Sequence, residues 1–258
     1  MDAMGCMLLR ECTDGVDKVE NISSIADEYP DIDYSIVADE FNAMLVALER
    51  VGVGVFLADS KYFPHTHRGV YHTVGNNFFL NRKFMGSTSY LMQVMRHEGW
   101  HAAQDCMAGT IKNSLIAIIK PENEVPMIWR TLAERTYPAS AVPWEAEASW
   151  AGRTENMTMK ALQACAAGEM WKVYKPTPMT REWLVENNYL PHIEYNLHGH
   201  GHYNHYHHPQ KHTHYHWHPK KDLIHAHKHK HGYGHRHHGI GQKHKVEKTK
   251  VDLHLHVH

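Results

Sequence analysis

Hydrophobic and polar positions follow two different periods in the first 190 residues. From Tyr34 to Arg50, apolar residues recur at helical spacing with charged residues between them, which predicts an amphipathic helix over 34–50. The next run, VGVGVFLAD over 51–59, is apolar and rich in valine, and it predicts a buried strand. Two more short runs, 69–74 and 76–84, are separated by Gly75 and predict a β-hairpin.

From Ser87 onward the spacing of apolar residues is helical again. Ser87 or Thr88 can cap a helix that extends to about Met107, and Gly109 can end it. Further helices are expected at about 125–136, 144–171 and 180–187. A helix, a small sheet and then mostly helices predict an α+β fold for a domain over 31–191. Residues 1–30 are polar and acidic, and we expect a loose N-terminal arm there.

The pattern changes abruptly after Pro191. Residues 192–258 contain 22 of the 27 histidines, mixed with aromatic residues, glycine and lysine, and too few aliphatic residues for a core. We therefore expect a disordered, low-complexity tail, in which only the final VDLHLHVH alternates like a strand. Three roles are open for it: a reservoir for additional divalent metals, a polycation at acidic pH, or no dedicated role.

Charge, hydropathy and cysteine content limit the possible partners and compartments. Residues 1–191 contain 17 Lys and Arg against 24 Asp and Glu, so no specific nucleic-acid partner is expected. The longest strongly apolar run, 114–119, is far shorter than the ~20 residues that span a membrane, and no signal peptide is recognisable. No C-x-x-C pair occurs among the cysteines, and we expect reduced thiols in a cytoplasmic protein, within a host cell or virion if it is viral.

The candidate chemistry lies in the sequence HEGWH, residues 97–101, within the helix expected after Ser87. On a helix, His97 and His101 lie one turn apart on one face, so both imidazoles can reach one Zn²⁺ at about 2.0–2.1 Å. Glu98 lies about 100° around the helix and can act as the general base for a zinc-bound water. Histidine is rare before residue 192, and a chance H-E-x-x-H match there has a probability of roughly 1%.

This motif and the acidic segment that follows resemble the gluzincin-like group of the zincin metallopeptidases, over roughly residues 50–155. The chain is also similar to small uncharacterised HExxH proteins encoded by phages. The resemblance implies a short sheet whose edge strand borders the cleft, a helix that carries both histidines, and a glutamate from a later helix as third ligand. The metzincin extension is absent, because Gln104 and Met107 occupy the positions of its glycine and third histidine.

The resemblance implies that the third ligand lies in PWEAEASWAGR, residues 143–153. In the register typical of the family, Glu145 is the ligand and Ala148 allows close helix packing, with Glu147 as an alternative. Other acidic residues, namely Glu134 and Glu155, stay open as well. Ser149 stands where the family frequently has an aspartate, so the group that orients a ligating histidine is not identified.

An oxyanion stabiliser is expected to complete the site, and Tyr137, His72 and Arg153 are its candidates. Together, the residues and the resemblance predict a zinc-dependent metallohydrolase that acts as a peptidase on a protein or peptide substrate. In that prediction His97, His101 and Glu145 hold Zn²⁺ and Glu98 is the catalytic base. The alternative is a metal-binding or storage protein that acts through its histidine-rich tail, with an inactive zincin-like domain.

Overall fold

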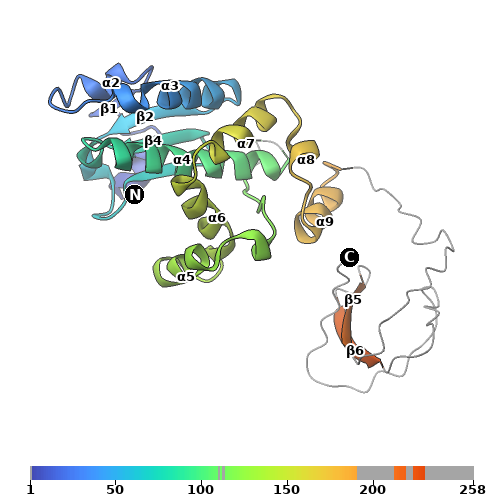
Figure 1. Ribbon diagram of the computed structural model, residues 1–258. Helices are drawn as coiled ribbons and strands as arrows, with labels where there is room; N and C mark the ends of the chain where they lie inside the picture. Colours follow the sequence, from blue (N-terminus) through green and yellow to red (C-terminus); the bar gives the residue numbers. More distant parts are fainter. Residues whose placement is uncertain (1, 110, 112–113, 191–211, 219–222, 230–258) are drawn as a thin grey trace. The chain divides into compact units, whose positions relative to one another are not determined.

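The computed structural model describes residues 2–109, 111, 114–190, 212–218 and 223–229. The chain divides into two units, residues 1–189 and 190–258, which we describe separately. The first unit contains every strand and helix from α1 to α9 and has the predicted α+β composition, with a mixed sheet followed by a helical half (Figure 1).

The sheet of the first unit has four strands in the order β1-β2-β4-β3. Their bounds are Val16–Lys18 for β1, Gly54–Ala58 for β2, Gly69–His72 for β3 and Asn77–Asn81 for β4. Strands β2 and β4 are parallel, and the outer strands β1 and β3 are each antiparallel to their neighbours. The hairpin predicted from the sequence is β3–β4, with Tyr71 opposite Phe78, and it leaves β3 as an edge strand.

Alternating side chains of the sheet enter two separate hydrophobic clusters, as the two-residue period of a strand requires. Val55, Leu57, Phe78 and Leu80 join the main core, which also contains buried residues of the long helices. Their sequence neighbours face the opposite side, where Met7 and the segment around Tyr62 cover them. Both faces of the sheet are thus buried, which explains the continuous apolar runs in β2 and β4.

The helices of the first unit follow the sheet in the chain, apart from three that precede or interrupt it. Their bounds are Ala3–Leu8 (α1), Ser23–Ala26 (α2), Ser35–Arg50 (α3), Thr88–Met107 (α4), Met127–Thr136 (α5), Val142–Arg153 (α6), Met157–Ala166 (α7), Met170–Val173 (α8) and Pro178–Glu186 (α9). Short 3-10 helices occupy Ser60–Tyr62, Arg82–Phe84 and Glu122–Glu124. Helix α4 packs against β3, α3, α6 and α7, so the histidine motif lies on the central helix of the unit.

Two sequence-based expectations about elements are wrong. Residues 2–30 are not a loose arm: they form α1, β1 and α2, and they bury Met7, Val19 and Ile25. The helix expected over 144–171 is divided into α6, α7 and α8, with Asn156 at a φ of 61° at the first break. The apolar period continues across the breaks because each helix turns its own apolar side to the same core.

Unit two contains a described pair of antiparallel strands, β5 at His212–His218 and β6 at Leu223–His229. These two strands are the described part of the histidine-rich tail. The terminal VDLHLHVH and the rest of the tail lie outside the described residues.

The cysteines differ from the expectation of reduced thiols. Two disulfides are present, Cys6–Cys12 and Cys106–Cys165, and the second links the end of α4 to α7. Because disulfides persist in oxidising compartments, this pairing does not support a cytoplasmic location. No helix in the described part of the chain is long and apolar enough to cross a membrane.

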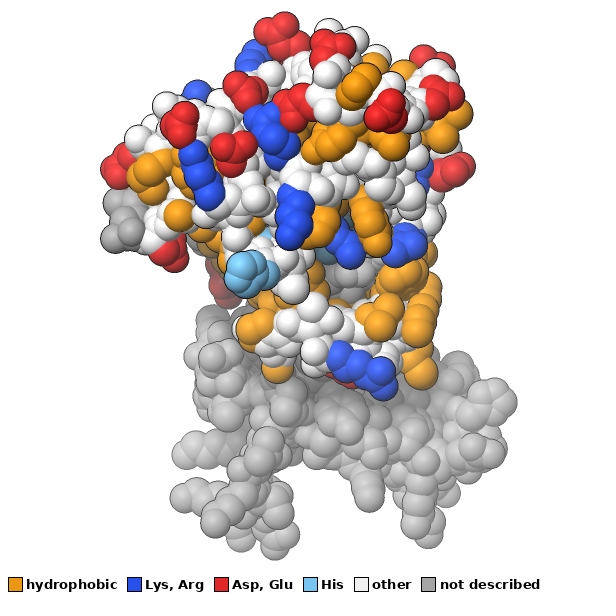
Figure 2. Space-filling model, turned by 90° about the vertical axis from the view of Figure 1, so that its left-hand side faces the viewer, with side chains coloured by type: hydrophobic (Ala, Val, Ile, Leu, Met, Phe, Trp, Pro, Cys, Tyr) orange, Lys and Arg blue, Asp and Glu red, His pale blue; other side chains and the backbone are white. Residues whose placement is uncertain are grey.

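Charged side chains on one face of the described residues are mixed in sign (Figure 2). On the face shown in Figure 2, acidic and basic side chains alternate with hydrophobic ones, and no continuous basic area is visible over the described residues.

In the part of the chain whose burial the structure describes, three buried clusters and both disulfides lie before residue 190, so residues 1–189 hold the packing that a stable fold needs. We expect limited proteolysis to leave a stable fragment that ends between about 188 and 200, because cleavage requires backbone outside such packing. Mass spectrometry of the protected fragment checks this. Protection of most of the tail would contradict it.

Candidate metal centre

Helix α4 carries the two histidines one turn apart, with His97 partly buried and His101 buried. The hydroxyl of Ser87 accepts a hydrogen bond from the backbone N–H of Tyr90 and caps the helix, as the sequence predicts. Leu91 and Met95 are fully buried in the main core and fix the rotation of the helix. The Nε2 atoms of His97 and His101 then lie 3.2 Å apart.

A glutamate of α6 completes the group. The Oε2 atom of Glu145 lies 3.3 Å from Nε2 of His97 and 3.7 Å from Nε2 of His101. Small residues let α6 approach α4 this closely: Ala148 is fully buried, and a Cβ added at Gly152 would lie 3.3 Å from the Cβ of His97. His97, His101 and Glu145 therefore form a group that could hold a metal ion.

The separations of the three ligand atoms match those around a small tetrahedral cation. With bonds of 2.0–2.1 Å, tetrahedral Zn²⁺ holds its ligand atoms about 3.3 Å apart. In addition, Oε2 of Glu145 is buried without a hydrogen-bond partner among the described residues. A buried carboxylate oxygen without a donor is unfavourable, and a cation bound between the three atoms would remove that cost.

In the metal-free protein, a proton on His101 supplies the positive charge beside the carboxylate of Glu145. Burial disfavours the charged form of His101, but the nearby carboxylates of Glu145 and Glu98 outweigh it and raise the pKa of His101 to about 9. Burial likewise opposes ionisation of Glu145, and the two histidines outweigh it and hold its pKa well below the usual range. Because a metal ion must displace this proton, binding should strengthen as the pH rises.

The other carboxylates considered from the sequence lie away from the histidines. Glu147 is fully buried and accepts hydrogen bonds from Trp100, Gln104 and the backbone N–H groups of residues 119 and 120. Glu134 and Glu155 are exposed. Of these four glutamates, the structure brings Glu145 alone to the histidine pair.

Glu98 is buried and held by the edge of the sheet. Its Oε2 atom accepts a hydrogen bond of 3.0 Å from the backbone N–H of Tyr71 in β3. The strand can come this close because Gly69 has no side chain: a Cβ there would lie 2.5 Å from Val94 and 3.2 Å from Cγ of Glu98. An edge strand thus sets the position of the carboxylate that follows the first histidine.

Tyr71 also reaches a second acidic residue of α4, which the sequence reasoning missed. Its hydroxyl donates a hydrogen bond of 2.8 Å to Oδ2 of Asp105, and burial raises the pKa of Asp105 to about 7. Asp105 lies two helical turns after Glu98, and this spacing was the available sequence signal.

Of the three candidate oxyanion stabilisers, the structure brings Tyr137 to the metal-ligand group. Burial, followed by the nearby carboxylates of Glu145 and Glu98, raises the pKa of Tyr137 well above its usual value. Tyr137 is therefore a phenol, and a hydrogen-bond donor, at neutral pH. His72 ends β3 opposite Asn77, and burial lowers its pKa.

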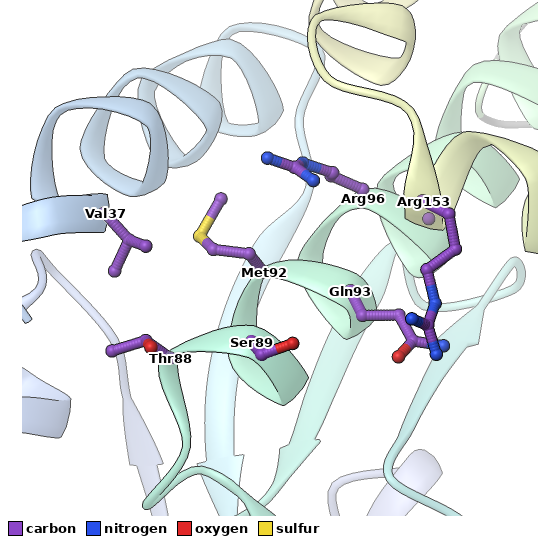
Figure 3. A pocket seen from close by; sticks show the side chains of 8 residues that line it. Val37, Thr88, Ser89, Met92, Gln93, Arg96 and Arg153 are labelled. Carbon is purple, nitrogen blue, oxygen red and sulfur yellow. The ribbon is translucent and has the colours of Figure 1, made fainter.

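Arg153 lies at a pocket that begins one helical turn before His97. The pocket has a volume of about 230 Å³ and is lined from α3, α4 and α6 by residues that include Ser89, Gln93, Arg96 and Arg153 (Figure 3). A Cβ added at Gly152 of the same lining would lie 3.1 Å from the backbone oxygen of Gln93 and 3.3 Å from the Cβ of His97, so the pocket adjoins the histidine face of α4.

No model of a protein family matches this chain, and no curated protein or solved structure matches it. The class of this protein therefore rests on its fold and its site alone: it is an α+β domain with a His/His/Glu group that could hold a metal ion.

Proposed function

We propose that the protein is a zinc-dependent hydrolase of peptide bonds. The observation that carries this proposal is the convergence of three ligand atoms, from His97, His101 and Glu145, beside a buried glutamate held at a sheet edge. Two imidazoles and one carboxylate form a donor set that suits Zn²⁺ and leaves a fourth position for water or substrate.

The neighbouring residues suit the two proton-related tasks of hydrolysis. When bound, zinc supplies Lewis-acid activation of water and of the substrate carbonyl at neutral pH. Glu98 has one oxygen held by Tyr71, so its carboxylate is oriented to accept the proton of the attacking water. Tyr137, which stays protonated, can donate a hydrogen bond to the negative charge that develops on the carbonyl oxygen.

The order of the elements supports a peptidase among zinc hydrolases. The edge strand β3 lies beside α4, the helix with both histidines, and the third carboxylate comes from the later helix α6. This is the arrangement that the resemblance to gluzincin-like enzymes implies. The pocket beside His97 is a candidate for one side chain of a peptide substrate.

Glu98→Gln tests the proposal directly. Glutamine keeps an oxygen that can accept from Tyr71 but cannot take a proton, so hydrolysis of a labelled denatured protein should fall by about 10²–10⁴-fold. The zinc content should not change, because the three ligands are intact. The exposed Glu134→Gln is the matched control. Equal activity of the wild type and Glu98→Gln would exclude Glu98 as the base.

A second candidate function is metal storage through the tail. One described feature favours it: the register of β5 and β6 places histidines opposite one another at three positions, namely His212 and His229, His214 and His227, and His216 and His225. Imidazole is a ligand for zinc, copper and nickel. Storage predicts no hydrolytic activity for Glu98→Gln to remove, which separates the two candidates.

A further inference from the structure

The ring of His101 has a hydrogen-bond partner at Nδ1, the nitrogen that does not belong to the metal-ligand group. Its Nδ1 atom lies 2.8 Å from Oε1 of Gln104, the residue one helical turn later, and both side chains are buried. Gln104 is fully buried, so its amide cannot exchange these partners for water. The contact therefore affects which ring nitrogen of His101 is available to a metal ion.

The other end of the amide determines its orientation. The Nε2 atom of Gln104 lies 2.8 Å from a carboxylate oxygen of Glu147 and 3.1 Å from the backbone oxygen of Trp144. Both partners are acceptors, so this atom must be the NH₂ group and Oε1 must face His101. An amide oxygen only accepts, so Nδ1 of His101 carries the proton. Its Nε2 atom is then the nitrogen with a lone pair for a metal.

Glu147 is itself fixed in place. Its carboxylate accepts hydrogen bonds from the indole of Trp100 and from the backbone N–H groups of Ile119 and Lys120, at 3.1, 2.9 and 2.6 Å. The segment around Ile119 is in turn tied to α4, because Ala117 donates to the backbone oxygen of Gln104. These contacts leave the amide of Gln104 with one orientation.

We propose that Gln104, anchored by Glu147, is the positioning residue that presents Nε2 of His101 to the metal. This inference rests on the proposed function and supplies the orienting group that Ser149 does not provide. Orienting partners of ligating histidines commonly change metal affinity by 10–100-fold. Gln104 belongs to α4 itself, so the ligand and its orienting group keep their spacing when other elements move.

Two substitutions in residues 1–189 separate positioning from a purely structural role. Gln104→Met keeps the volume but removes the acceptor, so we expect zinc affinity to fall about 10–100-fold. Gln104→Glu keeps an acceptor for His101 but places a second carboxylate against Glu147, so stability should fall while zinc affinity stays near that of the wild type. The exposed Gln163→Met, on α7, is the matched control.

Zinc affinity is measured by competition with a fluorescent chelator, and stability by urea unfolding of the metal-free fragment. Unchanged zinc affinity in Gln104→Met would overturn this inference, but it would not contradict the proposal that His97, His101 and Glu145 bind zinc. Losses of affinity that follow the losses of stability in both variants would overturn it as well, since they indicate structure alone. If the wild-type fragment binds no zinc, the proposed function fails and this inference fails with it.

Discussion

Glu145→Ala should abolish tight zinc binding by residues 1–189 and leave them folded. The substitution removes the only charged ligand and leaves two neutral imidazoles, so we expect a loss of more than about 100-fold in affinity. At pH 8, His101 can release its proton once Glu145 is absent, which limits the cost to stability. Chelator competition and urea unfolding on the same samples measure both quantities.

Glu147→Ala, two residues later, should weaken zinc binding only through the loss of the anchor of Gln104, and its main effect should be on folding. It removes the acceptor of the N–H groups of Trp100, Ile119 and Lys120, and one of the two acceptors of the Gln104 amide. Buried donors without partners cost about 1–3 kcal/mol each, so the free energy of unfolding should fall by about 3 kcal/mol or more. If Glu147→Ala removed zinc from a fully stable protein, the assignment of the third ligand would be wrong.

Removing the Cys106–Cys165 disulfide should destabilise the protein about twice as much as removing Cys6–Cys12. The first bridge spans 59 residues and the second spans 6. A longer closed loop restricts the unfolded chain more. The expected loss in the free energy of unfolding is therefore about 4 kcal/mol for Cys106–Cys165 and about 2 kcal/mol for Cys6–Cys12. The double serine variants of each pair, compared by urea unfolding under oxidising conditions, provide the measurement. Equal losses, or four titratable thiols in the purified protein, would contradict the prediction.

Most elements of the first unit could be predicted from their periodicity. The helix over 34–50, the hairpin after Gly69 and the capped helix from Ser87 all occur close to the expected bounds. The N-terminal elements could not, because isolated apolar residues such as Met7 and Ile25 fill single places in the core and form no repeating pattern. The disulfides also escaped prediction, because pairing depends on which residues the fold brings together.

For the site, helix geometry placed His97 and His101 together without further information. The choice of Glu145 needed the resemblance, because Glu145 and Glu147 both lie on the first turns of one helix. Tyr71 and Gln104 could not be assigned at all. One acts through its backbone N–H, which no residue type reveals, and the other depends on the direction in which a buried amide points.

Tyr71 also links the chemistry to the pairing of strands. The Tyr71 N–H meets Glu98 and its hydroxyl meets Asp105 only while Tyr71 pairs with Phe78. A slip of one residue between β3 and β4 would turn the phenol to the opposite face and leave both carboxylates of α4 without their partner. The three residues of the candidate metal group lie on α4 and α6 and would be unaffected. If the proposed function holds, a misfolded molecule of this kind carries a full complement of zinc and still lacks a correctly placed base, so metal content alone does not measure the fraction of active protein.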